Sequence, residues 1–276
     1  MLYGTIIGDI AGSSFEYLRH KFPIESWTAE ELIYIRGARF TDDTVMTMAV
    51  AHALWKSKHI IDEAIIKEFA ITSMLTYGNA YINTGYGGSF RRWLSEKDPK
   101  PYGSFGNGAA MRISPVGWYF NDIKQACEVS DWITDVSHNH EIAENGAKAV
   151  VSSIILLRQG KSKDEVKEYI KSNYGYNLDC PLENIHEVEV YDDIRCDVAV
   201  TKALIAFLNT DSFGECIKTA INISVDTDTV AAIAGSIAEP YYIKEEDMTY
   251  IDARTTAKTK IGSDFKNIIN KFASVL

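Results

Sequence analysis

The chain has 276 residues, with 28 lysines and arginines against 38 aspartates and glutamates, which gives a formal net charge of −10. Non-specific nucleic-acid binding depends on a basic surface, so this balance disfavours a nucleic-acid polymer as the partner. No apolar run approaches the ~18 residues of a membrane-spanning helix, and the first residues lack the basic start of a signal peptide. The four cysteines are scattered without a CxxC pair, which is typical of a reduced protein. We therefore expect a monomeric, cytoplasmic globular protein.

Helical spacing of apolar residues dominates the chain, beginning with an apolar N-terminal segment. Gly78-Asn79 is expected to end one helix and Pro240 another, because glycine favours helix ends and proline cannot continue the hydrogen-bond ladder. Only His186–Tyr191 alternates like a strand. Beyond the N-terminal segment, the predicted helices are Asp43–Lys58, Asp62–Tyr77, Ser89–Glu96, Asn121–Val136, Glu141–Gln159, Lys163–Asn173, Val198–Leu208, Phe213–Ile223, Thr229–Glu239 and Asp264–Ser274. No linker or repeat separates them, so the sequence predicts one all-α domain spanning residues 1–276.

Two acidic clusters each stand at the start of a predicted helix. The first is Thr41-Asp42-Asp43-Thr44 and the second is Asp226-Thr227-Asp228-Thr229. Either cluster alone can be a helix cap whose acids complement the helix dipole. If the two helix starts face each other, their carboxylates and hydroxyls form a set of hard oxygen ligands suited to Mg²⁺ or Mn²⁺ rather than Zn²⁺.

The N-terminal segment adds further acids. Gly4, Gly8 and Gly12 recur every four residues, which is typical of a face on which another helix packs closely. This stripe does not explain Asp9 within the apolar helix or Glu16 beyond it. A buried carboxylate needs a partner or a metal, so Glu16 is a candidate ligand or acid–base group.

The segment Tyr102–Arg112 is rich in glycine, and its exposed backbone N–H groups can bind phosphate without basic side chains. The alternative is a close-packed turn. Neither the Walker lysine nor the GxGxxG spacing is present. His138, in Ser-His-Asn-His, is either a core hydrogen-bonding residue or a contact to substrate phosphate or ribose.

The string Asp226-Thr227-Asp228-Thr229 also matches the nucleophile motif of haloacid-dehalogenase-like phosphatases. In that fold the motif follows a buried strand near the start of a doubly wound α/β domain. Here it follows the helix-patterned Phe213–Ile223 and lies late in the chain, so this alternative is disfavoured.

Six segments in order resemble the ADP-ribosylglycohydrolase family: GTIIGDIAGSSFE, FTDDTVMTMAVA, GYGGSFRRWL, SFGNGAAMRISPVGW, SHNHEIAENGAKAV and DTDTVAAIAGSIAE. The resemblance covers nearly the whole chain. It implies an all-α fold with two Mg²⁺ or Mn²⁺ ions in a central cleft. It also implies hydrolysis of the bond between C1″ of ADP-ribose and an acceptor, either a protein side chain or a small molecule.

The resemblance also implies roles for individual residues. Glu16 and Asp43 correspond to catalytic carboxylates, and Asp9 to a supporting residue. The implied metal ligands are Thr41, Asp42, Asp43, Asp226, Asp228 and Thr229. The implied substrate-binding residues are Ser104, Phe105, Gly106, Asn107, Gly108 and His138.

Three departures from the family pattern concern the surroundings of the site. Ser224-Val225 replaces two glycines before the late acidic cluster, Glu141 replaces a proline, and the segment from Cys196 reads Cys-Asp-Val-Ala-Val-Thr. These changes bear on substrate identity more than on catalysis.

The alternatives to a protein deADP-ribosylating enzyme are a catalytically silent ADP-ribose-binding protein and a hydrolase of a small ADP-ribosyl compound.

Overall fold

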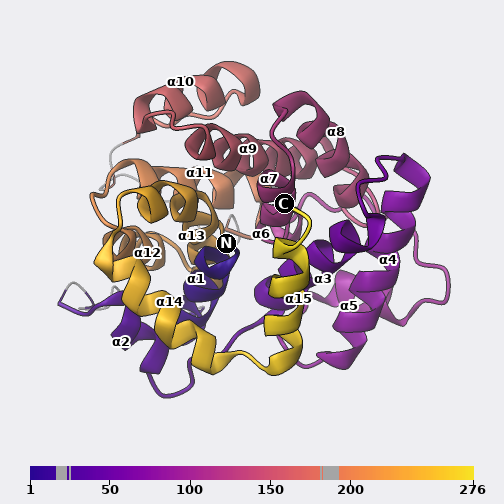
Figure 1. Cartoon of the computed structure of the whole chain (residues 1–276), viewed down its shortest axis with the longest axis horizontal. Helices are drawn as coiled ribbons and strands as arrows, with labels where there is room; N and C mark the ends of the chain where they lie inside the picture. Colours follow the sequence, from indigo (N-terminus) through magenta and orange to yellow (C-terminus); the bar gives the residue numbers. More distant parts are fainter. Residues whose placement is uncertain (17–23, 25, 181, 183–192) are drawn as a thin grey trace.

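The computed structural model describes residues 1–16, 24, 26–180, 182 and 193–276, and Figure 1 shows its helices. The described residues form helices and no strand. The helices are α1 (Tyr3–Gly12), α2 (Ala29–Tyr34), α3 (Asp42–Ser57), α4 (Glu63–Ala80), α5 (Gly88–Ser95), α6 (Gly108–Met111), α7 (Ser114–Tyr119), α8 (Ile123–Thr134), α9 (Glu141–Arg158), α10 (Lys163–Tyr174), α11 (Cys196–Leu208), α12 (Phe213–Asn222), α13 (Thr227–Lys244), α14 (Met248–Lys260) and α15 (Ser263–Ala273). The all-α prediction is confirmed. The strand candidate at residues 186–191 lies outside the described residues.

The central contact of the fold is between α1 and α13, which lie side by side in Figure 1. The glycine stripe of α1 faces α13 without any intervening side chain. A Cβ atom added to Gly8 would lie 2.0 Å from the carbonyl oxygen of Ala231, and one added to Gly4 would lie 2.1 Å from that of Gly235. The two backbones are therefore in direct contact, as the four-residue spacing of the glycines predicts.

Helix α13 is buried along nearly its whole length and packs against α1, α9, α11 and α12. It passes through Pro240 and ends at Lys244, so the predicted stop at Pro240 is wrong. Tertiary contacts hold the residues around the proline. The Glu239 carboxylate accepts hydrogen bonds from the Tyr250 hydroxyl and from the backbone N–H of Tyr3, and the Tyr242 hydroxyl donates to the Thr210 carbonyl. These contacts offset the lost ladder bond.

Helix α4 likewise continues through Gly78 to Ala80, against the predicted stop. A Cβ atom at Gly78 would lie 2.5 Å from a methyl group of Leu94, so this glycine permits α4 to approach α5 rather than ending α4. The short helices α2, α6 and α7 and the threonine-rich α14 were not predicted. No helix in the described ranges is both long enough and apolar enough to span a membrane.

The variant Gly8→Ala is expected to destabilise the protein by about 3 kcal/mol, because its methyl group must displace the backbone of α13. Chemical denaturation monitored by circular dichroism measures the loss. Gly88→Ala is the matched control, since a Cβ atom there meets nothing within 4 Å. An equal stability of the two variants would contradict close packing of α1 on α13.

Candidate active site

A cavity of about 520 Å³ opens beside the N-termini of α3 and α13 and the loop before α6. Every site residue predicted from the sequence lines it except Thr41, which caps α3 next to it. The predicted residues on its wall are Glu16, Asp42, Asp43, Ser104, Phe105, Gly106, Asn107, Gly108, His138, Asp226, Asp228 and Thr229. Segments far apart in the sequence therefore meet in one cleft.

Asp9 connects α1 to the beginning of α3. Its buried carboxylate accepts hydrogen bonds from the backbone N–H groups and side-chain hydroxyls of Thr41 and Thr44. Thr41 is the N-cap of α3, and its Oγ1 also lies 3.1 Å from a carboxylate oxygen of Asp43. Asp9 thus orients the early acidic cluster from beneath.

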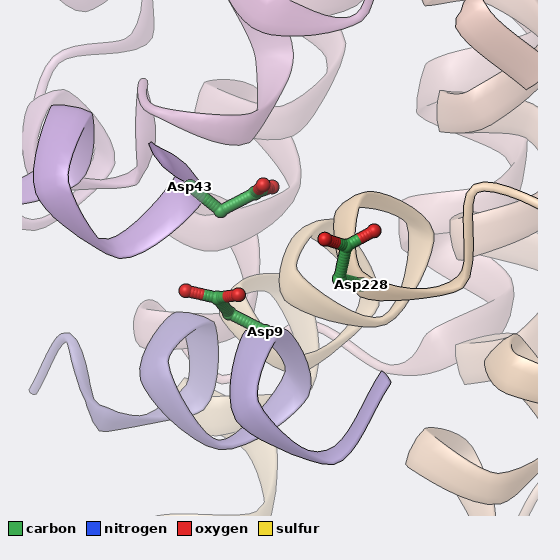
Figure 2. A group of neighbouring side chains, drawn as sticks. All are labelled: Asp9, Asp43 and Asp228. Carbon is green, nitrogen blue, oxygen red and sulfur yellow. The ribbon is translucent and has the colours of Figure 1, made fainter. Parts of the chain in front are cut away.

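The two acidic clusters face each other, as the sequence predicts. The Thr229 hydroxyl donates to the Asp43 carboxylate at 3.3 Å. Figure 2 shows Asp9, Asp43 and Asp228 extending from three helices toward a common space. One oxygen from each of these three lies within 4.8 Å of the others, and the same holds for Glu16, Asp226 and Asp228. Asp228 belongs to both groups.

Burial and mutual repulsion make ionisation of these carboxyls unfavourable. Burial raises the pKa of Asp9 to about 6 and, with the nearby Asp9 charge, that of Asp42 to about 8. Burial raises the pKa of Asp43 and Asp228 well above the usual value, with a further contribution from the charge of Asp9 beside Asp43 and of Asp226 beside Asp228. No ion pair in the described part of the chain reaches Asp9, Asp42, Asp43 or Asp228, and Oδ1 of Asp43 is buried without a hydrogen-bond partner there. Such a cluster favours cations.

The loop from Ser104 to Gly108 also lines the cleft. Its backbone is paired with the segment preceding α11: the Asn107 N–H donates to the Ile194 carbonyl, and the Cys196 N–H donates to the Phe105 carbonyl. Phe105 keeps 44% of its surface exposed. Its ring therefore stands at the cleft edge, where it can stack on a planar ligand.

His138 lies deep in the cleft and is held by a short polar chain. Its Nδ1 is 2.8 Å from the Ser137 hydroxyl, to which the buried Arg112 guanidinium donates at 2.7 Å. Burial and the Arg112 charge hold the pKa of His138 well below its usual value, so the imidazole is neutral. A Cβ atom at Gly108 would lie 2.9 Å from Nε2 of His138, which explains the glycine there.

Three residues that line or support the site were not predicted. Arg112 lies within the glycine-rich motif, but its burial has no sequence signal. Asp193 and Lys202 form a buried ion pair, and the Asp193 carboxylate accepts from the backbone N–H groups of Val225 and Asp226. Neither Ser224 nor Val225 has a positive φ, so the turn before α13 does not need the two glycines expected there.

A second cavity of similar volume, about 530 Å³, lies among α9, α10 and α11. It contains none of the residues predicted for the site. The chemistry of the linings therefore distinguishes the two cavities, because only the first combines converging carboxylates with a glycine-rich loop.

The fold and the cleft define an all-helical protein with a buried, carboxylate-rich centre beside a glycine-rich loop. Residues 1–238 match the ADP-ribosylglycohydrolase family. The chain belongs to this family, whose members hydrolyse ADP-ribose linkages.

Individual relatives are distant in sequence. ADP-ribosyl-[dinitrogen reductase] glycohydrolase of Rhodospirillum rubrum is 23% identical, with 87% of this chain and 83% of the relative covered. Human ADP-ribosylhydrolase ARH3 is 24% identical, with 87% and 84% covered. A solved structure titled ADP-ribosylglycohydrolase-related protein complex matches the fold with a TM-score of 0.63 at 18% identity, covering 94% of this chain and 96% of the other.

Metal-free protein is expected to lose stability as the pH rises from about 5 to about 8. A carboxyl whose pKa is higher in the folded state stabilises that state below the unfolded pKa, and this contribution disappears as the pH rises through the folded pKa. Asp9 and Asp42 place this loss near pH 6 and pH 8. A cation bound only by the folded state offsets it.

Thermal unfolding at about pH 5 and about pH 8, with a chelator or with excess Mg²⁺, measures this loss of stability. Mg²⁺ should raise the midpoint more at the higher pH, since metal binding requires deprotonated ligands. A midpoint unaffected by verified metal removal would contradict the expectation.

Proposed function

We propose that the protein hydrolyses the bond between C1″ of ADP-ribose and an acceptor, using two Mg²⁺ or Mn²⁺ ions and thereby reversing ADP-ribosylation. The observation that carries the proposal is that two sets of three carboxylates converge in the cleft that the glycine-rich loop also lines. The sets are Asp9, Asp43 and Asp228, and Glu16, Asp226 and Asp228, so they share Asp228. Membership of the family supports the reaction class. The net charge of −10 favours a modified protein or small molecule over a nucleic-acid polymer as substrate.

The donor set fits hard divalent cations. The groups that converge are carboxylates and threonine hydroxyls, and the orphaned Oδ1 of Asp43 is a free acceptor in the same space. In the proposal, the early cluster supplies Thr41, Asp42 and Asp43, and the late cluster supplies Asp226, Asp228 and Thr229. Asp9 already accepts hydrogen bonds at both oxygens, so it is assigned to orienting the early cluster.

The substrate lies between this cluster and the loop. The loop from Ser104 to Gly108 is assigned to the pyrophosphate and the adjoining ribose, with Phe105 stacking on the adenine. Within it, Asn107 is assigned to holding the loop in place, because its backbone N–H donates to Ile194 and its side-chain amide donates to Asp193 and Asp226. Neutral His138 at the base of the cleft acts as a hydrogen-bonding group, because its lowered pKa disfavours a charged form.

When bound, the ions supply Lewis-acid stabilisation to the ribose hydroxyls and the attacking water. Glu16 and Asp43 are assigned to proton transfer. One of these two carboxylates accepts a proton from water as the water oxygen forms a bond to C1″. The other, in its protonated form, gives its proton to the departing acceptor as the bond between the acceptor and C1″ breaks. Glu16 suits this role because its oxygen lies within 4.8 Å of Asp226 and Asp228 at the cleft wall.

The variants Asp42→Ala, Asp228→Ala and Glu16→Ala are expected to lower kcat by about 100-fold or more on ADP-ribosylated protein. The two aspartate variants should also weaken Mn²⁺ binding measured by calorimetry. Asp98→Asn is a control, since Asp98 is exposed and pairs with Lys100 outside the cleft. Full turnover in both aspartate variants would exclude the metal site. ADP-ribose binding without release from any of a panel of defined substrates would instead favour a silent binding protein.

Phe105→Ala is expected to raise KM about tenfold with little change in kcat, because stacking on a base contributes about 1–3 kcal/mol to binding. Steady-state kinetics with a defined ADP-ribosylated peptide measure both constants. Phe105→Tyr keeps the aromatic face and should restore KM. An unaltered KM in the alanine variant would remove Phe105 from the binding surface.

A further inference from the structure

Asp193 lies behind the cleft wall, where it joins α11, the turn before α13 and the loop before α6. Its carboxylate is fully buried, and one oxygen pairs with the ammonium group of Lys202 on α11. The other oxygen accepts hydrogen bonds from the backbone N–H of Val225 at 2.5 Å and of Asp226 at 3.4 Å. The turn that delivers the late acidic cluster is therefore bonded directly to this ion pair.

Asp193 and the turn before α13 are also hydrogen-bonded to the loop from Ser104 to Gly108, here called the substrate loop, through Asn107. The side-chain amide of Asn107 donates one hydrogen bond to the Asp193 carbonyl at 2.9 Å and another to the Asp226 carboxylate at 2.7 Å. Since an amide nitrogen carries two hydrogens, both are used in these contacts. Asp193 and Asn107 together fix the late cluster relative to the loop.

The turn before α13 needs such an external support. Asp226 is the N-cap of α13, but its side chain makes no capping hydrogen bond. The carboxylate is thus left to point into the cleft, while Asp193 satisfies the backbone N–H of the same residue. Lys202 compensates the buried charge of Asp193, which would otherwise be costly and would repel the neighbouring acids.

We propose that the Asp193–Lys202 pair is a positioning device that sets the placement of Asp226 against the substrate loop, and with it the cation affinity of the late cluster. Its effect on the cation rests on the proposed function, whereas its effect on the turn does not. Supporting residues that orient metal ligands typically contribute 10–100-fold to metal affinity or activity.

Two double variants separate positioning from the burial of charge. Asp193→Asn with Lys202→Met removes both charges but keeps an acceptor oxygen facing the turn. Asp193→Ala with Lys202→Met removes the charges and the acceptor. If the pair positions the turn, the two double variants should differ in amide exchange at the turn and in Mn²⁺ affinity. If the pair is merely structural, both properties should be the same in the two variants.

The first readout is hydrogen exchange of metal-free protein, followed by NMR. The amides of Val225 and Asp226 should exchange at least about tenfold faster in the alanine double variant than in the asparagine one, while amides within α9 do not change. Equal exchange at the turn overturns the proposal, whether or not the protein binds metal.

The second readout is calorimetric titration with Mn²⁺, in which the alanine double variant should bind about tenfold more weakly than the asparagine one. Lys148→Met is the matched control, because Lys148 pairs with Asp131 between α8 and α9, outside the cleft. Wild-type protein without Mn²⁺ affinity would count against the proposed function, while exchange at the turn would still decide the role of Asp193. Wild-type binding with equal affinity in both double variants would overturn the link between the pair and the cation.

Discussion

The direct contact between the backbones of α1 and α13 is the constraint on which the site depends. Because Gly4 and Gly8 carry no side chain, α1 approaches α13 until a methyl group would not fit between them. This approach brings Asp9 of α1 and Asp228 of α13 to one side of the contact, and Asp9 in turn holds the start of α3 through Thr41 and Thr44. One packing interaction therefore assembles the acidic centre from three helices.

The resulting centre is locally unfavourable, and the rest of the fold supports it. Burial raises the pKa of Asp43 and Asp228, and no ion pair within the described part of the chain reaches either carboxylate. The buried ammonium group of Lys202 pairs with Asp193, which accepts from the backbone N–H of Asp226. Clusters of buried carboxyls lower stability, and such locally unfavourable arrangements are common where a fold carries function. The acid excess evident in the composition is thus partly concentrated at one point in the interior.

Much of this arrangement follows from local sequence patterns. Apolar periodicity predicts most helices, the glycine stripe predicts that another helix packs closely on the N-terminal one, and the two acidic clusters predict the facing helix starts. The errors arise where tertiary contacts override local preference, as at Pro240 and Gly78. Asp193 and Lys202 could not be predicted, because an isolated aspartate and lysine gain meaning only when folding brings the distant turn at Val225 beside them. The departure at Ser224-Val225 is similarly explained only by the backbone geometry.

The sharing of Asp228 between the two carboxylate groups has a thermodynamic consequence. A change in the charge or orientation of its carboxylate in one set also changes the ligand that it provides to the other set. In the proposed two-ion site, a cation bound at either set of carboxylates would change the affinity of the other set, and by linkage the change would be equal in both directions. The proposal therefore implies coupled binding, with a saturation curve that departs from that of independent sites.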